Sequence, residues 1–122
     1  MKNFNKKTGD LGESIAEMYL SSIGYKIMDR NFRCRIGEID IIGKDADYIC
    51  FIEVKTRKSI KYGFPYESVN YRKQLKIYKV AKLYILKNKI YNLNYRFDVV
   101  EIILNMYSNK HNIKLIKNAF YI

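Results

Sequence analysis

Residues 37–57 read GEIDIIGKDADYICFIEVKTR, two apolar runs that are each interrupted by charged residues. The first run alternates polar and apolar residues with period two and ends at Gly43, as a strand does. Lys44–Asp47 has the composition of a turn, and the run YICFIEVKTR that follows reads as a second strand. The stretch therefore predicts two strands that pair as a hairpin around this turn.

The hairpin sorts its residues into faces, because side chains alternate across a strand. The faces predicted to carry the charges hold Glu38, Asp40 and Ile42 on the first strand and Phe51, Glu53, Lys55 and Arg57 on the second. The opposite faces hold Ile39 and Ile41, then Ile52, Val54 and Thr56. If the apolar faces turn toward a core, Asp40, Glu53 and Lys55 come together in one small patch.

Such a patch suits metal-assisted cleavage of a phosphodiester. Two carboxylates can hold Mg²⁺ or Mn²⁺ and leave positions open for water and a phosphate oxygen. A lysine beside them can orient the attacking water or offset the charge that develops on phosphorus. The alternative is a solvated strand face whose cross-strand ion pairs contribute little. Charges inside the apolar run FIEVK are costly to bury without a function, which favours the site.

Two helices are predicted outside the hairpin. Thr8 is placed to cap a helix that runs to about Ile23, and Gly24 follows it as a helix-ending residue. Ser68 is placed to cap a longer helix that runs to about Asn88.

Three further strands complete the pattern. YKIMDRNFR, at 25–33, precedes the hairpin, and RFDVVEIIL, at 96–104, follows the second helix. NIKLIK, at 112–117, comes last, after a turn at Ser108–Asn112, and Lys58–Glu67 reads as a loop. The order α-β-β-β-α-β-β predicts an α/β fold with a mixed central sheet flanked by helices.

The composition of the chain fits one globular domain over residues 1–122. No apolar stretch approaches the ~18 residues of a membrane span, and the N-terminal sequence MKNFNKKTGDLGE resembles no secretory signal, so the expected location is the cytoplasm. Two cysteines and a single histidine are too few to build a thiolate or imidazole site. Any bound metal should therefore be a hard cation held by carboxylates.

The formal net charge of +11 favours a polyanionic partner, and nucleic acid is the commonest of these. An A+T-rich coding sequence would also enrich Lys, Ile, Asn and Tyr, so part of the lysine excess has a second explanation. Between Val54 and Lys89 the chain holds eleven Lys and Arg residues and one acidic residue, Glu67. The basic residues in this region could contact phosphates, or they could form a solvated face. The residues favoured for these contacts are Arg57, Lys58, Lys61, Arg72 and Lys76.

Several segments of the chain resemble a known family. Glu13, GEID at 37–40 and EVK at 53–55 resemble the motif of the PD-(D/E)xK, restriction-endonuclease-like nucleases, with Ile39 in place of the motif's proline. More closely, the chain is similar to the YraN-like bacterial proteins. That resemblance covers most of the chain through GDLGESIAEMYL, RNFR, GEIDII, FIEVKTR and RFDVV. It implies a restriction-endonuclease-like fold.

The resemblance also implies roles for individual residues. Asp40 and Glu53 would hold the metal, and Lys55 would be the catalytic lysine. Glu13 matches the helical glutamate of Holliday-junction-resolvase-like members and would add a third carboxylate to the metal site. On the residues alone, Glu13 lies at the edge of a polar helix stripe, where it could instead stabilise the helix dipole.

Gln74 and Tyr78 have a Q-x-x-x-Y spacing that some nucleases of this superfamily carry beside the metal. This resemblance makes them candidates for the nucleic-acid-binding set. A tyrosine at helical spacing can equally be a core residue.

The expected function is a metal-dependent nuclease, an endonuclease that hydrolyses DNA phosphodiester bonds, with branched or structured DNA among its candidate substrates. The alternative is a non-catalytic nucleic-acid-binding protein that keeps a nuclease-like fold. A hydrolase acting on RNA is a third reading, although no RNA-specific module is visible in the sequence. Cleavage of junctions would require a symmetric homodimer, and the sequence identifies no surface for one.

Overall fold

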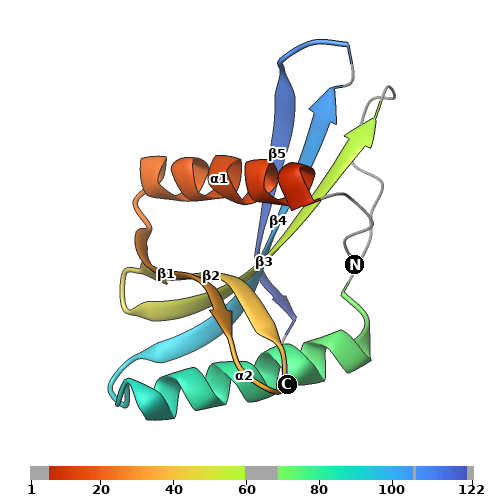
Figure 1. The fold of residues 1–122 in the computed structure, drawn as a ribbon. Helices are drawn as coiled ribbons and strands as arrows, with labels where there is room; N and C mark the ends of the chain where they lie inside the picture. Colours follow the sequence, from red (N-terminus) through yellow and green to blue (C-terminus); the bar gives the residue numbers. More distant parts are fainter. Residues whose placement is uncertain (1–5, 60–68, 106, 121–122) are drawn as a thin grey trace.

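The computed structural model describes residues 6–59, 69–105 and 107–120. Their elements confirm the predicted α/β class and the order α-β-β-β-α-β-β (Figure 1). The elements are α1 (Lys6–Ser22), β1 (Lys26–Arg33), β2 (Glu38–Asp45), β3 (Tyr48–Ser59), α2 (Tyr71–Lys87), β4 (Asn94–Asn105) and β5 (His111–Phe120).

The five strands form one mixed sheet in the order β1-β2-β3-β4-β5. β3 and β4 are parallel, and the other neighbouring pairs are antiparallel. Parallel neighbours need a long crossover connection, and α2 lies within the segment that joins β3 to β4. The two helices lie on opposite sides of the sheet, α1 in red and orange and α2 in green (Figure 1).

An apolar layer lies on each side of the sheet. The α2-side layer includes Phe51 and Phe97 from the strands and Tyr84 from the helix. The α1-side layer includes Ile52 from β3 and Leu20 from the helix. Both faces of β3 are therefore covered, so any charged side chain in the middle of this strand is enclosed.

The helix starts differ from the predictions. α1 already includes Lys6, so Thr8 lies inside the helix, where it is buried and does not act as the N-cap. α2 is capped by Asn70, whose side-chain oxygen accepts a hydrogen bond from the backbone N–H of Lys73 at 2.9 Å. Asn70 is as good a capping residue as serine, and its bond sets the first turn. Ser68 lies outside the described residues. Gly24 follows α1 with φ +104°, as a helix-ending glycine does.

The strand ends also differ. β2 runs through Lys44 to Asp45, so the hairpin turn is shorter than predicted. β3 continues to Ser59 because it pairs with β4 along its full length, which places Lys58 in the strand and not in a loop. The rest of the predicted loop, with Lys61, lies outside the described residues. β5 spans His111–Phe120, longer than predicted, because Phe120 stacks on Phe97 with ring centroids 4.9 Å apart. Neither described helix has the length and apolar character needed to cross a membrane.

Candidate active site

The candidate site begins where β2 and β3 separate. Their ladder runs from Asp45 and Tyr48 to Ile41 and Ile52 and stops there among the residues that the structure describes. Asp40 is the next residue of β2 and is only 2% exposed. Its Oδ2 accepts a hydrogen bond from the backbone N–H of Val54 at 2.8 Å. The carboxylate thus replaces the backbone of β2 as the partner of β3, and the two strands form a fork around it.

A twist of β2 directs this carboxylate into the fork. The prediction that Ile39 and Ile41 share a face is wrong, because Ile39 packs in the α2-side layer and Ile41 in the α1-side layer. On β1, Asn31 lies between the partners of these two residues and has φ +57°, a left-handed conformation that interrupts regular pleating. Asp40 therefore lies where β2 changes faces, with its side chain aimed at β3.

Glu53 is one residue from this contact and is 6% exposed. The N–H that Asp40 binds belongs to the peptide bond that joins Glu53 to Val54. The Asp40 carboxylate therefore contacts the backbone next to Glu53. On the α2 side, Glu53 Oε2 lies 3.2 Å from the Nζ of Lys73, which stands in the first turns of α2. The lysine compensates the buried charge of Glu53, which would otherwise be costly.

Lys55 follows on β3 and is half-buried. Its partner in the β3–β4 register is Glu101, which is 5% exposed. Glu101 in turn pairs in register with Lys114 of β5. A buried carboxylate therefore lies beside the candidate catalytic lysine, and it comes from a strand that the sequence prediction left out of the site.

Glu13 approaches the sheet from α1. Gly12 brings the helix against β3 so closely that a Cβ on Gly12 would stand 2.8 Å from the Cβ of Thr56. Glu13 is buried beside this contact, and its Oε1 lies 3.6 Å from Nε of Arg30 on β1. Arg30 also holds Glu17 of α1 at 3.2 Å, so it fastens the helix to the sheet edge.

The structure brings some of the predicted residues together and not others. Asp40 contacts the Glu53–Val54 peptide within the fork, and Lys55 follows on the same strand. Glu13 belongs to the α1 side and the ion pair of Glu53 to the α2 side, on opposite sides of the sheet (Figure 1). Within the described ranges, no three Asp, Glu, His or Cys residues are close enough together to hold a metal ion. The expected three-carboxylate set is therefore not assembled in this arrangement.

The candidate nucleic-acid contacts lie around the same strand. Arg57 is half-buried on β3, and Lys58, Arg72 and Lys76 are exposed. Lys61 lies outside the described residues, and Gln74 and Tyr78 both contact neighbouring groups. Gln74 donates from Nε2 to the carbonyl of Val69 at 2.7 Å, and Tyr78 packs against the α2-side layer with Lys82 Nζ 5.5 Å from its ring centre.

A second buried polar cluster lies at the other end of the sheet. Arg96 Nε donates to Asp98 Oδ1 at 2.9 Å, and its Nη2 donates to Asp45 Oδ2 at 2.7 Å. The Tyr25 hydroxyl donates to Asp98 Oδ2 at 2.9 Å. Burial, and next the charge of Asp98, raise the pKa of Tyr25 far above its usual value. Hydrogen bonding from Arg96 is the main cause that lowers the pKa of Asp45, against the opposing effect of burial. This cluster fastens β2 to β4.

Sequence reasoning missed Glu101, Asp98, Arg96, Arg30 and Lys73. A signal for two of them was present in RFDVVEIIL, where Asp98 and Glu101 interrupt an apolar strand as Glu53 interrupts FIEVK. The cost of burying a charge applies equally to both strands. Nothing in the sequence pairs Lys73 with Glu53 or Arg30 with Glu13, because these contacts depend on which helix covers which face.

Comparisons with known proteins find relatives that match this chain along its whole length. The model of the uncharacterised protein family UPF0102 matches residues 12–102. A UPF0102 protein of Clostridium kluyveri is 62% identical over 122 residues, covering 100% of both chains. Relatives from Clostridium tetani and Clostridium acetobutylicum are 58% and 56% identical, covering 98% and 100% of each chain, and both are also called UPF0102 proteins.

Proposed function

This chain belongs to the UPF0102 family, and from its site we propose that it is a nuclease that uses Mg²⁺ or Mn²⁺ to hydrolyse DNA phosphodiester bonds. The proposal includes its place among the PD-(D/E)xK nucleases. One observation carries it. The acidic residues Asp40 and Glu53 are both buried at the strand fork, where Asp40 accepts a hydrogen bond from the peptide N–H that follows Glu53, and Lys55 follows on the same strand. Buried charges are costly unless they are paired or coordinate a metal.

The donor set suits a hard cation held by two residues. Mg²⁺ commonly takes one or two carboxylates and fills its other positions with water and phosphate oxygens. Asp40 and Glu53 would hold it, and Glu13, the third carboxylate that the resemblance implies, contacts Arg30 on the α1 side in this arrangement. When bound, such a metal polarises the phosphoryl group and lowers the pKa of a coordinated water. Lys73 now compensates Glu53 and would have to release it.

Lys55 acts on the reacting phosphate in this proposal. Its strand pairs with β4 at Lys55 itself, and Asp40 of β2 holds the N–H of the preceding Val54, so the backbone of Lys55 is fixed before substrate arrives. A fixed ammonium group can orient the attacking water and offset the charge that develops on the phosphoryl oxygens. Arg57, Lys58, Arg72 and Lys76 would hold the DNA backbone without sequence preference.

The test compares cleavage of branched, flapped, single-stranded and duplex DNA in Mg²⁺ or Mn²⁺. Wild type is compared with Asp40→Asn and Lys55→Ala, and with Lys26→Ala as a matched lysine control on the exposed start of β1. We expect Asp40→Asn and Lys55→Ala to lose cleavage and Lys26→Ala to cleave as well as wild type. Cleavage that survives both site substitutions would show that the activity lies elsewhere or in a contaminant.

A non-catalytic nucleic-acid-binding protein is the second candidate, and one feature favours it. Lys73 already supplies a positive charge to Glu53, and the described residues contain no three-ligand group. This candidate predicts DNA binding that persists with a chelator and no cleavage of any substrate by wild type. Cleavage that depends on Asp40 and Lys55 would exclude it.

A further inference from the structure

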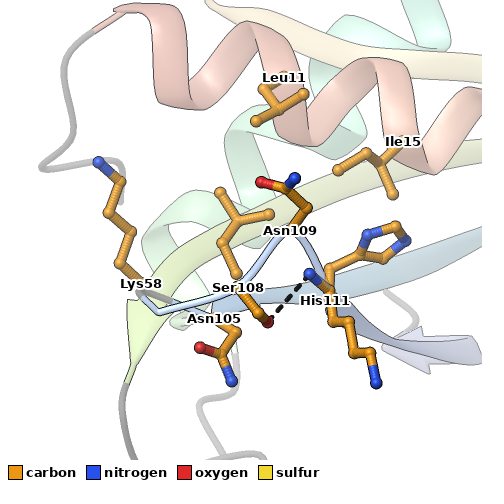
Figure 2. A pocket seen from close by; sticks show the side chains of 9 residues that line it. Leu11, Ile15, Lys58, Asn105, Ser108, Asn109 and His111 are labelled. Carbon is orange, nitrogen blue, oxygen red and sulfur yellow. Dashed lines mark hydrogen bonds between the residues drawn. The ribbon is translucent and has the colours of Figure 1, made fainter.

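A pocket of about 570 Å³ lies between α1 and the loop that joins β4 to β5, next to the end of β3. Figure 2 shows Leu11 and Ile15 pointing from α1 toward this loop, with Lys58 on one side and His111 on the other. Its volume falls in the range of small-ligand sites. No residue described above for metal binding or catalysis lines it.

One part of the lining is apolar and open to solvent. Leu11, Ile15 and Leu104 supply this surface, and Leu11 is 50% exposed. The flat face of a nucleobase can cover such a surface, because every base has an apolar π-face whatever its sequence.

The remaining lining is polar and contains no acidic residue. Lys58 and Lys110 supply positive charge, and His111, Asn105, Ser108 and Asn109 can form hydrogen bonds. The loop fixes some of these groups. Asn105 Oδ1 accepts from the N–H of Tyr107 at 2.7 Å, and Ser108 Oγ accepts from the N–H of Lys110 at 3.2 Å (Figure 2). The amide nitrogen of Asn105 and the hydroxyl hydrogen of Ser108 remain donors for a ligand.

The pocket is also placed along the candidate path of the DNA. Lys58 lies three residues beyond Lys55 on β3, which at ~3.3 Å per residue separates their Cα atoms by about 10 Å. That is about three steps of a DNA strand at ~3.4 Å each. Because side chains alternate along a strand, Lys55 and Lys58 point to opposite faces of β3, and a DNA strand that contacts both must pass along the edge of β3 beyond Ile52, where its ladder with β2 has ended.

We propose that this pocket binds an unpaired nucleotide of the DNA strand that passes the candidate active site. The base covers Leu11 and Ile15, the amides meet its edge, and Lys58 and Lys110 hold its phosphates. This inference rests on the proposed nuclease function and names its substrate class as DNA with an unpaired segment. A fully paired duplex cannot place a base in the pocket.

The first test measures binding of a fluorescent oligothymidylate and of a blunt-ended, fully paired duplex by anisotropy, with a chelator present to prevent cleavage. Leu11→Glu is compared with Met18→Glu, the same charge change two turns along the same face of α1, where Met18 is 75% exposed and outside the pocket. We expect Leu11→Glu to weaken single-strand binding about tenfold or more, because it removes apolar contact with the base and places a carboxylate beside the phosphates, and Met18→Glu to change it less than about twofold. Equal weakening by both variants would overturn the proposal that this pocket binds a nucleotide.

The second test needs no substitution and so does not depend on how a variant folds. The sequence has a single histidine, so the His111 ring gives one identifiable set of NMR signals. We expect these signals to shift when oligothymidylate is added to wild type and to stay in place with the duplex. Saturating single-strand binding without a His111 shift would overturn the inference alone. Failure of wild type to bind any DNA would overturn the proposed function as well.

Discussion

At the scale of single residues, Asp40 combines two separable properties, an oxygen that accepts a hydrogen bond and a negative charge. The oxygen completes the hydrogen bonding of β3 at the fork, and the charge is what a metal would need. Substitutions can remove the charge alone or both properties, so the structural and chemical roles can be measured apart.

Asp40→Asn keeps an acceptor for the Val54 N–H, whereas Asp40→Ala removes it. We expect the alanine variant to lose about 1–3 kcal/mol of unfolding free energy, because it leaves a buried N–H unsatisfied. The asparagine variant should lose less stability, yet it should lose all metal-dependent cleavage. Urea unfolding and cleavage assays check the two effects, with Asp47→Ala in the exposed hairpin turn as control. Equal stability of both Asp40 variants would contradict the proposed role of the hydrogen bond.

The Lys73–Glu53 ion pair makes a second prediction about a single residue. If Glu53 holds the metal, the Lys73 ammonium competes for the same carboxylate oxygen. Lys73→Gln should then increase Mn²⁺ affinity, by about tenfold for each ~1.4 kcal/mol of competition removed. Calorimetric titration checks this, with Lys76→Gln, an exposed lysine one turn further along α2, as the matched control. Unchanged affinity in Lys73→Gln, with measurable binding in wild type, would remove Glu53 from the metal site.

At the scale of elements, the contact of α1 with β3 depends on one glycine. Gly12 packs on Thr56, and a Cβ at this position would collide with the Thr56 side chain, whereas Gly9 has nothing within 4 Å of its missing Cβ. Helix and strand can approach this closely only because Gly12 has no side chain. The position of Glu13, the next residue, follows from that approach.

Gly12→Ala and Gly9→Ala are therefore a matched pair within one helix. We expect Gly12→Ala to lose about 1–3 kcal/mol of stability through overpacking. Gly9→Ala should gain about 0.5–1 kcal/mol, because alanine favours the helix more than glycine does. Thermal or urea unfolding measures both. If the two substitutions had the same effect, close packing would not be what places α1 on the sheet.

Element order and type could be predicted from the sequence because each strand and helix has its own periodicity. The hairpin follows from residues close in the chain, and so does the placing of Glu53 and Lys55 on one face of β3. The parallel pairing of β3 with β4 was not among the predictions, because it joins segments far apart in the chain. The twist at Asp40 could not be predicted, since it depends on Asn31 of the neighbouring strand and on two separate apolar layers. The ion pairs of Glu13 and Glu53 could not be predicted either, because their partners, Arg30 and Lys73, lie 17 and 20 positions away in the chain.

At the scale of the whole molecule, the sheet carries a polar cluster at each end. The fork of β2 and β3 holds Asp40, and the hairpin end of β2 holds Asp45, which Arg96 of β4 and Lys117 of β5 both contact. Asp45 lies five positions beyond Asp40 on β2, about 16 Å at ~3.3 Å per residue. The distant cluster fastens β2 across the sheet to β4 and β5, so its contribution to stability can be changed without touching the candidate site.

The depressed pKa of Asp45 gives this contribution a defined pH dependence. Its folded pKa is below the unfolded value, so its stabilisation is fully present above about pH 4 and is lost as the pH falls through the folded pKa. Asp45→Asn should therefore be less stable than wild type at neutral pH and lose less stability on acidification, so that the two curves converge. Urea unfolding across the acid range measures this. Cleavage at neutral pH should be unchanged in Asp45→Asn, because the fork at Asp40 is intact. If the stability of Asp45→Asn fell with pH in parallel with wild type, Arg96 and Lys117 would not stabilise the charged form of Asp45. Loss of cleavage in this variant would mean that the two ends of the sheet are coupled.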